Sequence, residues 1–98
     1  MAFQIEKQEN GFVFTFTGRL DTATAQSITQ QVQEITAELK DMNTTIDVTQ
    51  LEYISSSGIR LLLLIRKASG KQVTLQGVRP EIMQILKVTK LDTMFTIV

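Results

Sequence analysis

The chain has 98 residues, of which 43% are hydrophobic and 20% are charged, and its ten basic residues balance its ten acidic ones. This length and composition predict one globular domain over residues 1–98, and the zero net charge provides no overall attraction for nucleic acid or an anionic membrane. The sequence has no cysteine and no histidine. These absences exclude disulfides, thiolate chemistry, histidine zinc sites and histidine-dependent serine triads.

The chain also lacks sequence signals for a membrane or for secretion. Its longest apolar run, Leu61 to Ile65, is far shorter than the roughly 20 residues of a spanning helix, so we expect no direct membrane insertion. The N-terminus, MAFQIEKQ, lacks the basic start and apolar stretch of a signal peptide. Because an absence of cysteine also suits a reducing compartment, the sequence predicts a cytoplasmic protein.

Alternating apolar residues predict two strands at the N-terminus. Phe3 and Ile5 alternate with polar residues, and three phenylalanines alternate in the same way further on, namely Phe12, Phe14 and Phe16. Asn10-Gly11 lies between the two patterns and favours a tight turn, because both residues tolerate positive φ. The sequence therefore predicts an antiparallel hairpin. We expect the phenylalanines in the core, since lysine and arginine do not interleave with them as on a base-stacking surface.

A long amphipathic helix is predicted from Thr22 to Leu39, with Asp21 or Thr22 as its cap. Its apolar residues form one stripe at helical spacing, made of Ile28, Val32, Ile35 and Leu39. A short strand is predicted next, from Thr44 to Thr49. The residues from Gln50 to Ile54 are expected to form a bridge outside that strand.

Three consecutive serines follow the bridge, at positions 55 to 57. Serine at a helix start accepts bonds from free N–H groups, so these residues predict a helix that begins at Ser56 or Ser57 and runs to about Ser69. Gly70 is placed to end it in a left-handed cap. One serine suffices for a cap, so three consecutive serines exceed what the cap requires. The free N–H groups at a helix start also attract anions. We therefore expect the functional site at this loop.

The rest of the chain predicts a strand, a helix and a terminal strand. Gln72–Gln76 alternates, Pro80 suits the first turn of a helix, and Phe95–Val98 forms a final strand. The buried stripe of that helix is expected to consist of Ile82, Ile85 and Leu86. The predicted order is β-β-α-β-α-β-α-β. This order indicates an α/β fold with one mixed β-sheet, an N-terminal antiparallel hairpin and helices in crossover connections.

Three motifs occur in the order and spacing of a known family. Gly18-Arg19-Leu20-Asp21 is similar to a G-x-L-D pattern before a long helix, and Tyr53-Ile54-Ser55-Ser56-Ser57-Gly58-Ile59 is similar to a D-S-S-G-[LI] loop after a strand. The ending from Val88 to Val98 is similar to the family's last segment. Together the motifs span nearly the whole chain. They resemble the STAS domain of bacterial anti-sigma factor antagonists, which implies a single STAS-like domain.

The resemblance implies a bacterial regulator of transcription that works by protein binding. Such a protein binds an anti-sigma factor that is itself a serine kinase, and thereby frees a sigma factor. Phosphorylation of the loop serine ends the binding, and a serine phosphatase restores it. In this sequence that serine corresponds to Ser56, with Ser57 as the local alternative. Ser55 stands where the family most often has aspartate, and Arg60 stands where many members have glycine.

Two other functions stay open at this point. One is a non-phosphorylated STAS scaffold, or an accessory subunit of an ABC-type lipid transporter. The other is an enzyme with a serine nucleophile, which needs a base, and without histidine only a lysine could serve. We expect no catalysis, no cofactor and no metal.

Helix geometry predicts which residues share a surface with the loop. At about 100° per residue, Ser56, Arg60 and Lys67 project in nearly the same direction. The residues that point the opposite way, into the core, are Leu61, Leu62, Ile65 and Ala68. Leu63 and Leu64 flank the exposed stripe, and we hypothesise that both are partly exposed and form the apolar centre of a partner-binding surface. The alternative is that both are buried core residues.

Asp21 and Asp47 are expected at the ends of two strands, near the serine loop. Helix capping by Asp21 and hydrogen bonding of loop amides by Asp47 explain both residues, and a paired-carboxylate or Mg²⁺ site is the alternative. The resemblance implies that acidic residues line the loop that contacts the kinase. The predicted partner-binding residues are Asp21, Asp47, Ser55, Ser56, Ser57, Gly58, Arg60, Leu63, Leu64 and Lys67.

Overall fold

The computed structural model describes residues 2–98, in which five strands form one sheet in the order β1-β2-β3-β4-β5. The strands are β1 (Ala2–Lys7), β2 (Gly11–Leu20), β3 (Asn43–Ile54), β4 (Thr74–Gln76) and β5 (Thr96–Ile97). β1 and β2 are antiparallel, and every other neighbouring pair is parallel. The predicted mixed sheet with an N-terminal hairpin is therefore confirmed.

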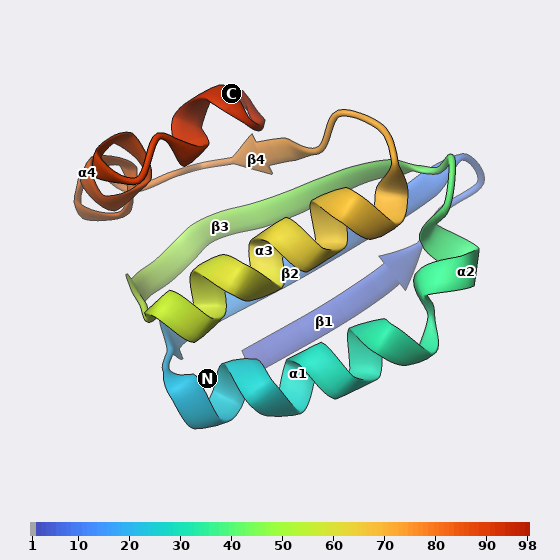
Figure 1. The fold of residues 1–98 in the computed structure, drawn as a ribbon, viewed down its shortest axis with the longest axis horizontal. Helices are drawn as coiled ribbons and strands as arrows, with labels where there is room; N and C mark the ends of the chain where they lie inside the picture. Colours follow the sequence, from blue (N-terminus) through green and yellow to red (C-terminus); the bar gives the residue numbers. More distant parts are fainter. Residues whose placement is uncertain (1) are drawn as a thin grey trace.

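The helices occur in the segments that connect consecutive parallel strands along the chain. They are α1 (Thr22–Glu34), α2 (Thr36–Leu39), α3 (Ser56–Ser69) and α4 (Pro80–Val88), with a 3₁₀ turn, η1 (Leu91–Thr93), before β5. α1 and α3 pack side by side across the same face of the sheet (Figure 1). Within residues 2–98, none of these helices has the length and apolar character that a membrane span requires.

The core lies between that helix layer and the sheet. Phe12, Phe14 and Phe16 of β2 are buried, whereas Thr15 and Thr17 point to the other face and are partly exposed. This alternation agrees with the period-two pattern of the sequence. The helices contribute buried side chains from the other side, including Ile28, Val32, Leu39, Leu61, Leu62, Ile65, Ile82 and Leu86. Ile35 and Ile85, predicted as buried, are only partly so.

β3 is twice as long as the predicted strand, and the expected bridge from Gln50 to Ile54 is its second half. The pairing of β2 with β3 shifts register at two places, and each shift adds one extra residue to β3. These irregularities place buried side chains at Val48, Leu51 and Ile54, three residues apart. A three-residue spacing has neither strand nor helix periodicity, which explains why the sequence pattern indicated a bridge.

Smaller differences occur at three other elements. The single helix expected from Thr22 to Leu39 is interrupted at Ile35, whose N–H donates to Val32 O at 3.0 Å. β4 and β5 are shorter than Gln72–Gln76 and Phe95–Val98. Gly70 has a φ of 70° and ends α3 in the left-handed conformation, as predicted.

Thr44, at the start of β3, allows a test of what an unpaired buried hydroxyl costs in stability. Its side chain is 2% exposed, and its hydroxyl has no hydrogen-bond partner within residues 2–98. Because an unsatisfied buried hydroxyl costs about 1–3 kcal/mol, Thr44→Val should raise the free energy of unfolding by about 1 kcal/mol. Urea unfolding followed by circular dichroism measures this change. The control is Thr45→Val on the partly exposed opposite face, with an expected effect within about 0.5 kcal/mol; equal effects of both substitutions would contradict the prediction.

Candidate functional site

The site is built where β2 and β3 end side by side. Leu20 pairs with Ile54, and the N–H of Ser55 donates to Leu20 O at 2.9 Å. Each strand is followed at once by a helix, so Asp21 and Ser55 are the N-caps of α1 and α3 at the same edge of the sheet. This edge, at the carboxyl ends of parallel strands, is where open α/β sheets place their binding sites.

The three serines have three different environments. Ser55 is 7% exposed, and its hydroxyl oxygen accepts a hydrogen bond from Gly58 N–H at 3.1 Å. Ser57 is 8% exposed, and its hydroxyl oxygen accepts one from Arg60 Nη2 at 3.1 Å. Ser56 is exposed. Of the three hydroxyl groups, that of Ser56 is therefore the one exposed to solvent.

Ser55 occupies the position where the resembled family most often has aspartate. Serine and aspartate are both favoured N-caps, because each offers a side-chain oxygen to the free N–H groups of the first turn. Ser55 makes this bond, to Gly58 N–H. The serine therefore preserves the start of the helix and removes only the negative charge.

Gly58 is buried against the chain's own core. A Cβ at this position would lie 2.7 Å from Ile54 Cγ1 and 3.0 Å from Leu20 Cδ2. Such contacts are closer than side chains tolerate. The close approach that this glycine permits is therefore that of α3 onto the ends of β2 and β3.

The exposed stripe of α3 agrees with the helical-wheel prediction. Ser56, Arg60 and Lys67 are exposed, and Leu63 and Leu64 are partly exposed. The alternative that both leucines are fully buried is excluded. Helix geometry places them on opposite sides of Arg60, at about 60° and 40° around the axis, with Leu64 on the side of Ser57.

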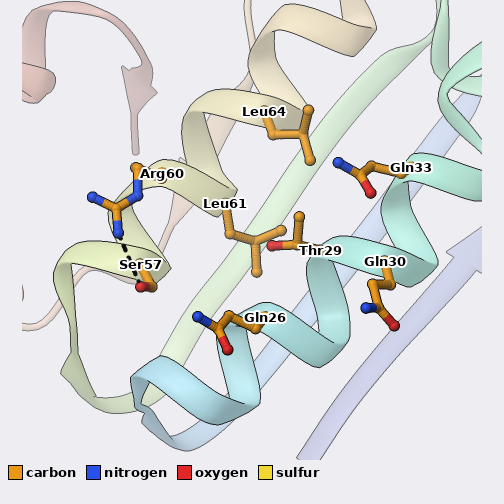
Figure 2. A pocket seen from close by; sticks show the side chains of 8 residues that line it. All are labelled: Gln26, Thr29, Gln30, Gln33, Ser57, Arg60, Leu61 and Leu64. Carbon is orange, nitrogen blue, oxygen red and sulfur yellow. Dashed lines mark hydrogen bonds between the residues drawn. The ribbon is translucent and has the colours of Figure 1, made fainter.

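A groove of about 540 Å³ runs between α1 and α3. Figure 2 shows its two walls, with Gln26, Thr29, Gln30 and Gln33 from α1 and Ser57, Arg60, Leu61 and Leu64 from α3. Sequence reasoning missed the α1 wall. The signal was present in Gln26, Gln30 and Gln33, which repeat at helical spacing, but uncharged polar residues of this kind usually mark a solvated face.

The two acidic residues do not converge, because Asp21 lies at the end of β2 beside the serine loop and Asp47 does not. Asp21 accepts a hydrogen bond from Thr24 N–H at 2.9 Å. This bond lowers the pKa of the Asp21 carboxyl, and the positive charge of the nearby Arg19 lowers it to a smaller extent. Asp47 lies within β3, pairs with Thr15 and accepts bonds from Thr49 N and Oγ1 at 3.0 and 2.7 Å. The expectation that Asp47 ends its strand is wrong, because β3 continues through the irregular pairing.

A second pair of side chains beside the loop was missed by the sequence pattern. Arg19 and Tyr53 are paired across β2 and β3, and the Arg19 guanidinium carbon lies 4.2 Å from the centre of the Tyr53 ring. Both residues are exposed. Tyrosine and arginine are enriched in protein interfaces, and Tyr53 is the single tyrosine of the chain.

The sequence profile of the STAS domain matches residues 2–98. The chain belongs to the STAS domain family. Its fold is similar to that of the anti-sigma factor antagonist SpoIIAA in its unphosphorylated form, at a TM-score of 0.76 and 19% identity over 99% of this chain and 87% of that one.

Two further solved structures share the fold of this STAS domain. The Bacillus cell fate determinant SpoIIAA in its phosphorylated form has a TM-score of 0.76 and 18% identity, covering 99% of this chain and 91% of the other. An anti-sigma factor antagonist from Mycobacterium paratuberculosis has a TM-score of 0.82 and 21% identity, covering 98% of this chain and 83% of the other. These similarities establish the SpoIIAA-like fold.

The N-cap of α3 generates a prediction about stability. Ser55→Ala removes the acceptor for Gly58 N–H and should lower the free energy of unfolding by about 1 kcal/mol. Ser55→Asp keeps an acceptor at a helix start that favours negative charge, so its stability should stay close to that of the parent chain. Urea unfolding of the three proteins at pH 7 compares them. Equal stabilities of the Ala and Asp variants would show that the cap bond is unimportant.

The packing of Gly58 generates a second prediction. Gly58→Ala gains roughly 1 kcal/mol of helix propensity but forces a methyl group against Leu20 and Ile54, at a cost of about 1–3 kcal/mol. We expect a net loss of stability of up to about 2 kcal/mol in thermal or urea unfolding. Ser56→Ala, on the exposed side of the same turn, is the control and should change stability by less than about 0.5 kcal/mol. A Gly58→Ala protein more stable than its parent would refute the packing argument.

Proposed function

We propose that this STAS domain is an anti-sigma factor antagonist, a protein-binding switch that sequesters an anti-sigma factor with serine kinase activity. In this proposal the bound state frees a sigma factor, and phosphorylation of Ser56 ends the binding. The observation that carries the proposal is the exposure of Ser56 between two buried serines at the start of α3. Membership of the STAS family and the fold shared with SpoIIAA, which is known in phosphorylated and unphosphorylated forms, support it.

The partner supplies the chemistry of the switch. The Ser56 Oγ attacks the γ-phosphorus of ATP held by the kinase, the bond to the bridging oxygen breaks, and ADP leaves. The hydroxyl proton passes to a base of the kinase. This STAS domain acts as substrate and has no catalytic role of its own, and a serine phosphatase of the partner system reverses the step by hydrolysis. We place this cycle in the cytoplasm, where ATP and sigma factors are found.

The partner surface that we propose surrounds Ser56. Its exposed polar members are Asp21, Arg60 and Lys67, and its apolar members are the partly exposed Leu63 and Leu64. Ser55, Ser57 and Gly58 support this surface from below, because all three are buried. Asp47 is left outside it, since its carboxylate is bonded to Thr49 within β3.

Phosphorylation acts on this surface by charge. A phosphoserine adds about 1.5 to 2 negative charges at neutral pH. A helix start favours negative charge, so the fold should remain intact. A partner surface matched to a neutral hydroxyl would instead face a phosphate dianion, and juxtaposed like charges or desolvated charges oppose association.

The proposal predicts one site of phosphate transfer. Incubation with ATP and each kinase-like anti-sigma protein of the source organism, followed by mass spectrometry, should locate phosphate on Ser56. Ser56→Ala should abolish incorporation, whereas Ser57→Ala, the matched control one residue away, should retain it. Ser56→Asp should weaken binding of the same kinase by roughly tenfold or more.

Phosphate on Ser57 would identify the other serine as the acceptor. No incorporation with any kinase, together with full function of Ser56→Asp, would favour the non-phosphorylated scaffold or the accessory subunit of an ABC-type lipid transporter.

A further inference from the structure

Arg60 is the charged residue nearest in sequence to the phosphoacceptor on the exposed stripe of α3, and its partner is a neutral hydroxyl. Its Nη2 donates to Ser57 Oγ at 3.1 Å, and within residues 2–98 no carboxylate forms a salt bridge with it. The bond shows that the Arg60 side chain turns back over the first turn of the helix, as long side chains in helices do. Its guanidinium therefore already lies beside the serine loop, as Figure 2 shows.

Helix geometry places Arg60 between Ser56 and Ser57 around the helix axis. Ser57 lies three residues before it and Ser56 four residues before it, so they are about 60° and 40° to either side of Arg60 around the helix axis. Residues at a spacing of four are neighbours, with Cβ atoms about 5–6 Å apart. A guanidinium that reaches Ser57 can reach Ser56 by a change of rotamer.

The other cations near the loop are less suited to Ser56. Lys67 lies 11 residues further along the helix, which is roughly 16 Å at 1.5 Å per residue. Arg19 stacks on Tyr53 and lies near the Asp21 carboxylate, to which it is electrostatically coupled. The α1 wall that faces Arg60 contributes only uncharged side chains to the groove. Arg60 is thus the cation placed to meet a charge on Ser56.

We propose that Arg60 is the phosphate-binding residue of the phosphorylated state: its guanidinium leaves Ser57 Oγ and pairs with the phosphate on Ser56. The inference rests on the proposed function, in which Ser56 is phosphorylated. A charge-assisted bond from arginine to phosphate is roughly twice as strong as a neutral one, and the guanidinium can make two such bonds in parallel. The phosphate therefore outcompetes the Ser57 hydroxyl for the same side chain.

This exchange changes the surface in two ways at once. The phosphate adds negative charge, and the pairing withdraws Arg60 from contact with a partner. The α3 side of the groove also loses the hydrogen bond between Arg60 and Ser57. The phosphorylated domain thus holds its phosphate against its own helix, and Arg60 is no longer available to a partner.

The test uses the full chain with phosphoserine incorporated at position 56 during translation, so that it does not depend on any kinase. The second ionisation of the phosphate is followed by ³¹P NMR as a function of pH. A paired guanidinium favours the dianion, so the midpoint in the parent chain should lie at a pH about 0.5 lower than in Arg60→Gln. Lys67→Gln, which removes the same charge from the same stripe, is the control and should leave the midpoint unchanged.

The outcomes separate the inference from the proposed function. Equal midpoints in the parent chain and Arg60→Gln overturn the role of Arg60, even if a kinase phosphorylates Ser56. An equal shift in Lys67→Gln overturns it as well, because it would show a diffuse field in place of a specific pair. Failure of every kinase to modify Ser56 overturns the proposed function, whatever the midpoint shows. Circular dichroism of both variants verifies that the fold is unchanged.

Discussion

The site depends on one hydrogen bond that joins the ends of two strands. The N–H of Ser55 donates to Leu20 O, which fixes the last pair of β2 and β3 and places the first residues of α1 and α3 at the same edge. The absence of a side chain at Gly58 then allows α3 to rest on Leu20 and Ile54. A shift of one residue in this pairing would turn the side chains at the strand ends to the other face and remove that support.

The same constraint distinguishes three serines that are chemically identical. Because α3 begins where the strand pairing ends, the N-cap falls on Ser55, whose hydroxyl is occupied by Gly58 N–H. Ser57 then turns toward α1 and Arg60, and Ser56 turns outward. If the helix began one residue later, a different serine would face the solvent. The identity of the exposed serine is therefore a consequence of backbone register, not of any property of its own side chain.

This dependence explains which features the sequence could predict. The turn of the hairpin spans Gln8–Gly11, where neither Asn10 nor Gly11 has a positive φ, so the expected turn chemistry is wrong. The hairpin itself, α3, its Gly70 cap and the exposed stripe follow from local periodicity and from the left-handed cap that Gly70 permits. The length of β3 does not, because two irregularities space its buried residues by three, and the misplacement of Asp47 follows from the same cause. The groove required knowing that α1 packs beside α3, a contact between segments some 30 residues apart in sequence that no local pattern specifies.

The two departures from the pattern of the resembled family act in the same electrostatic direction. Serine in place of aspartate at position 55 removes one negative charge, and arginine in place of glycine at position 60 adds one positive charge, so the surroundings of Ser56 are more positive by two charges. The cap of α3 is unaffected, because Ser55 still accepts the Gly58 N–H. A positive environment stabilises a dianion more than it stabilises a neutral hydroxyl. In the proposed switch, both substitutions would therefore stabilise the dianionic charge of a phosphate on Ser56.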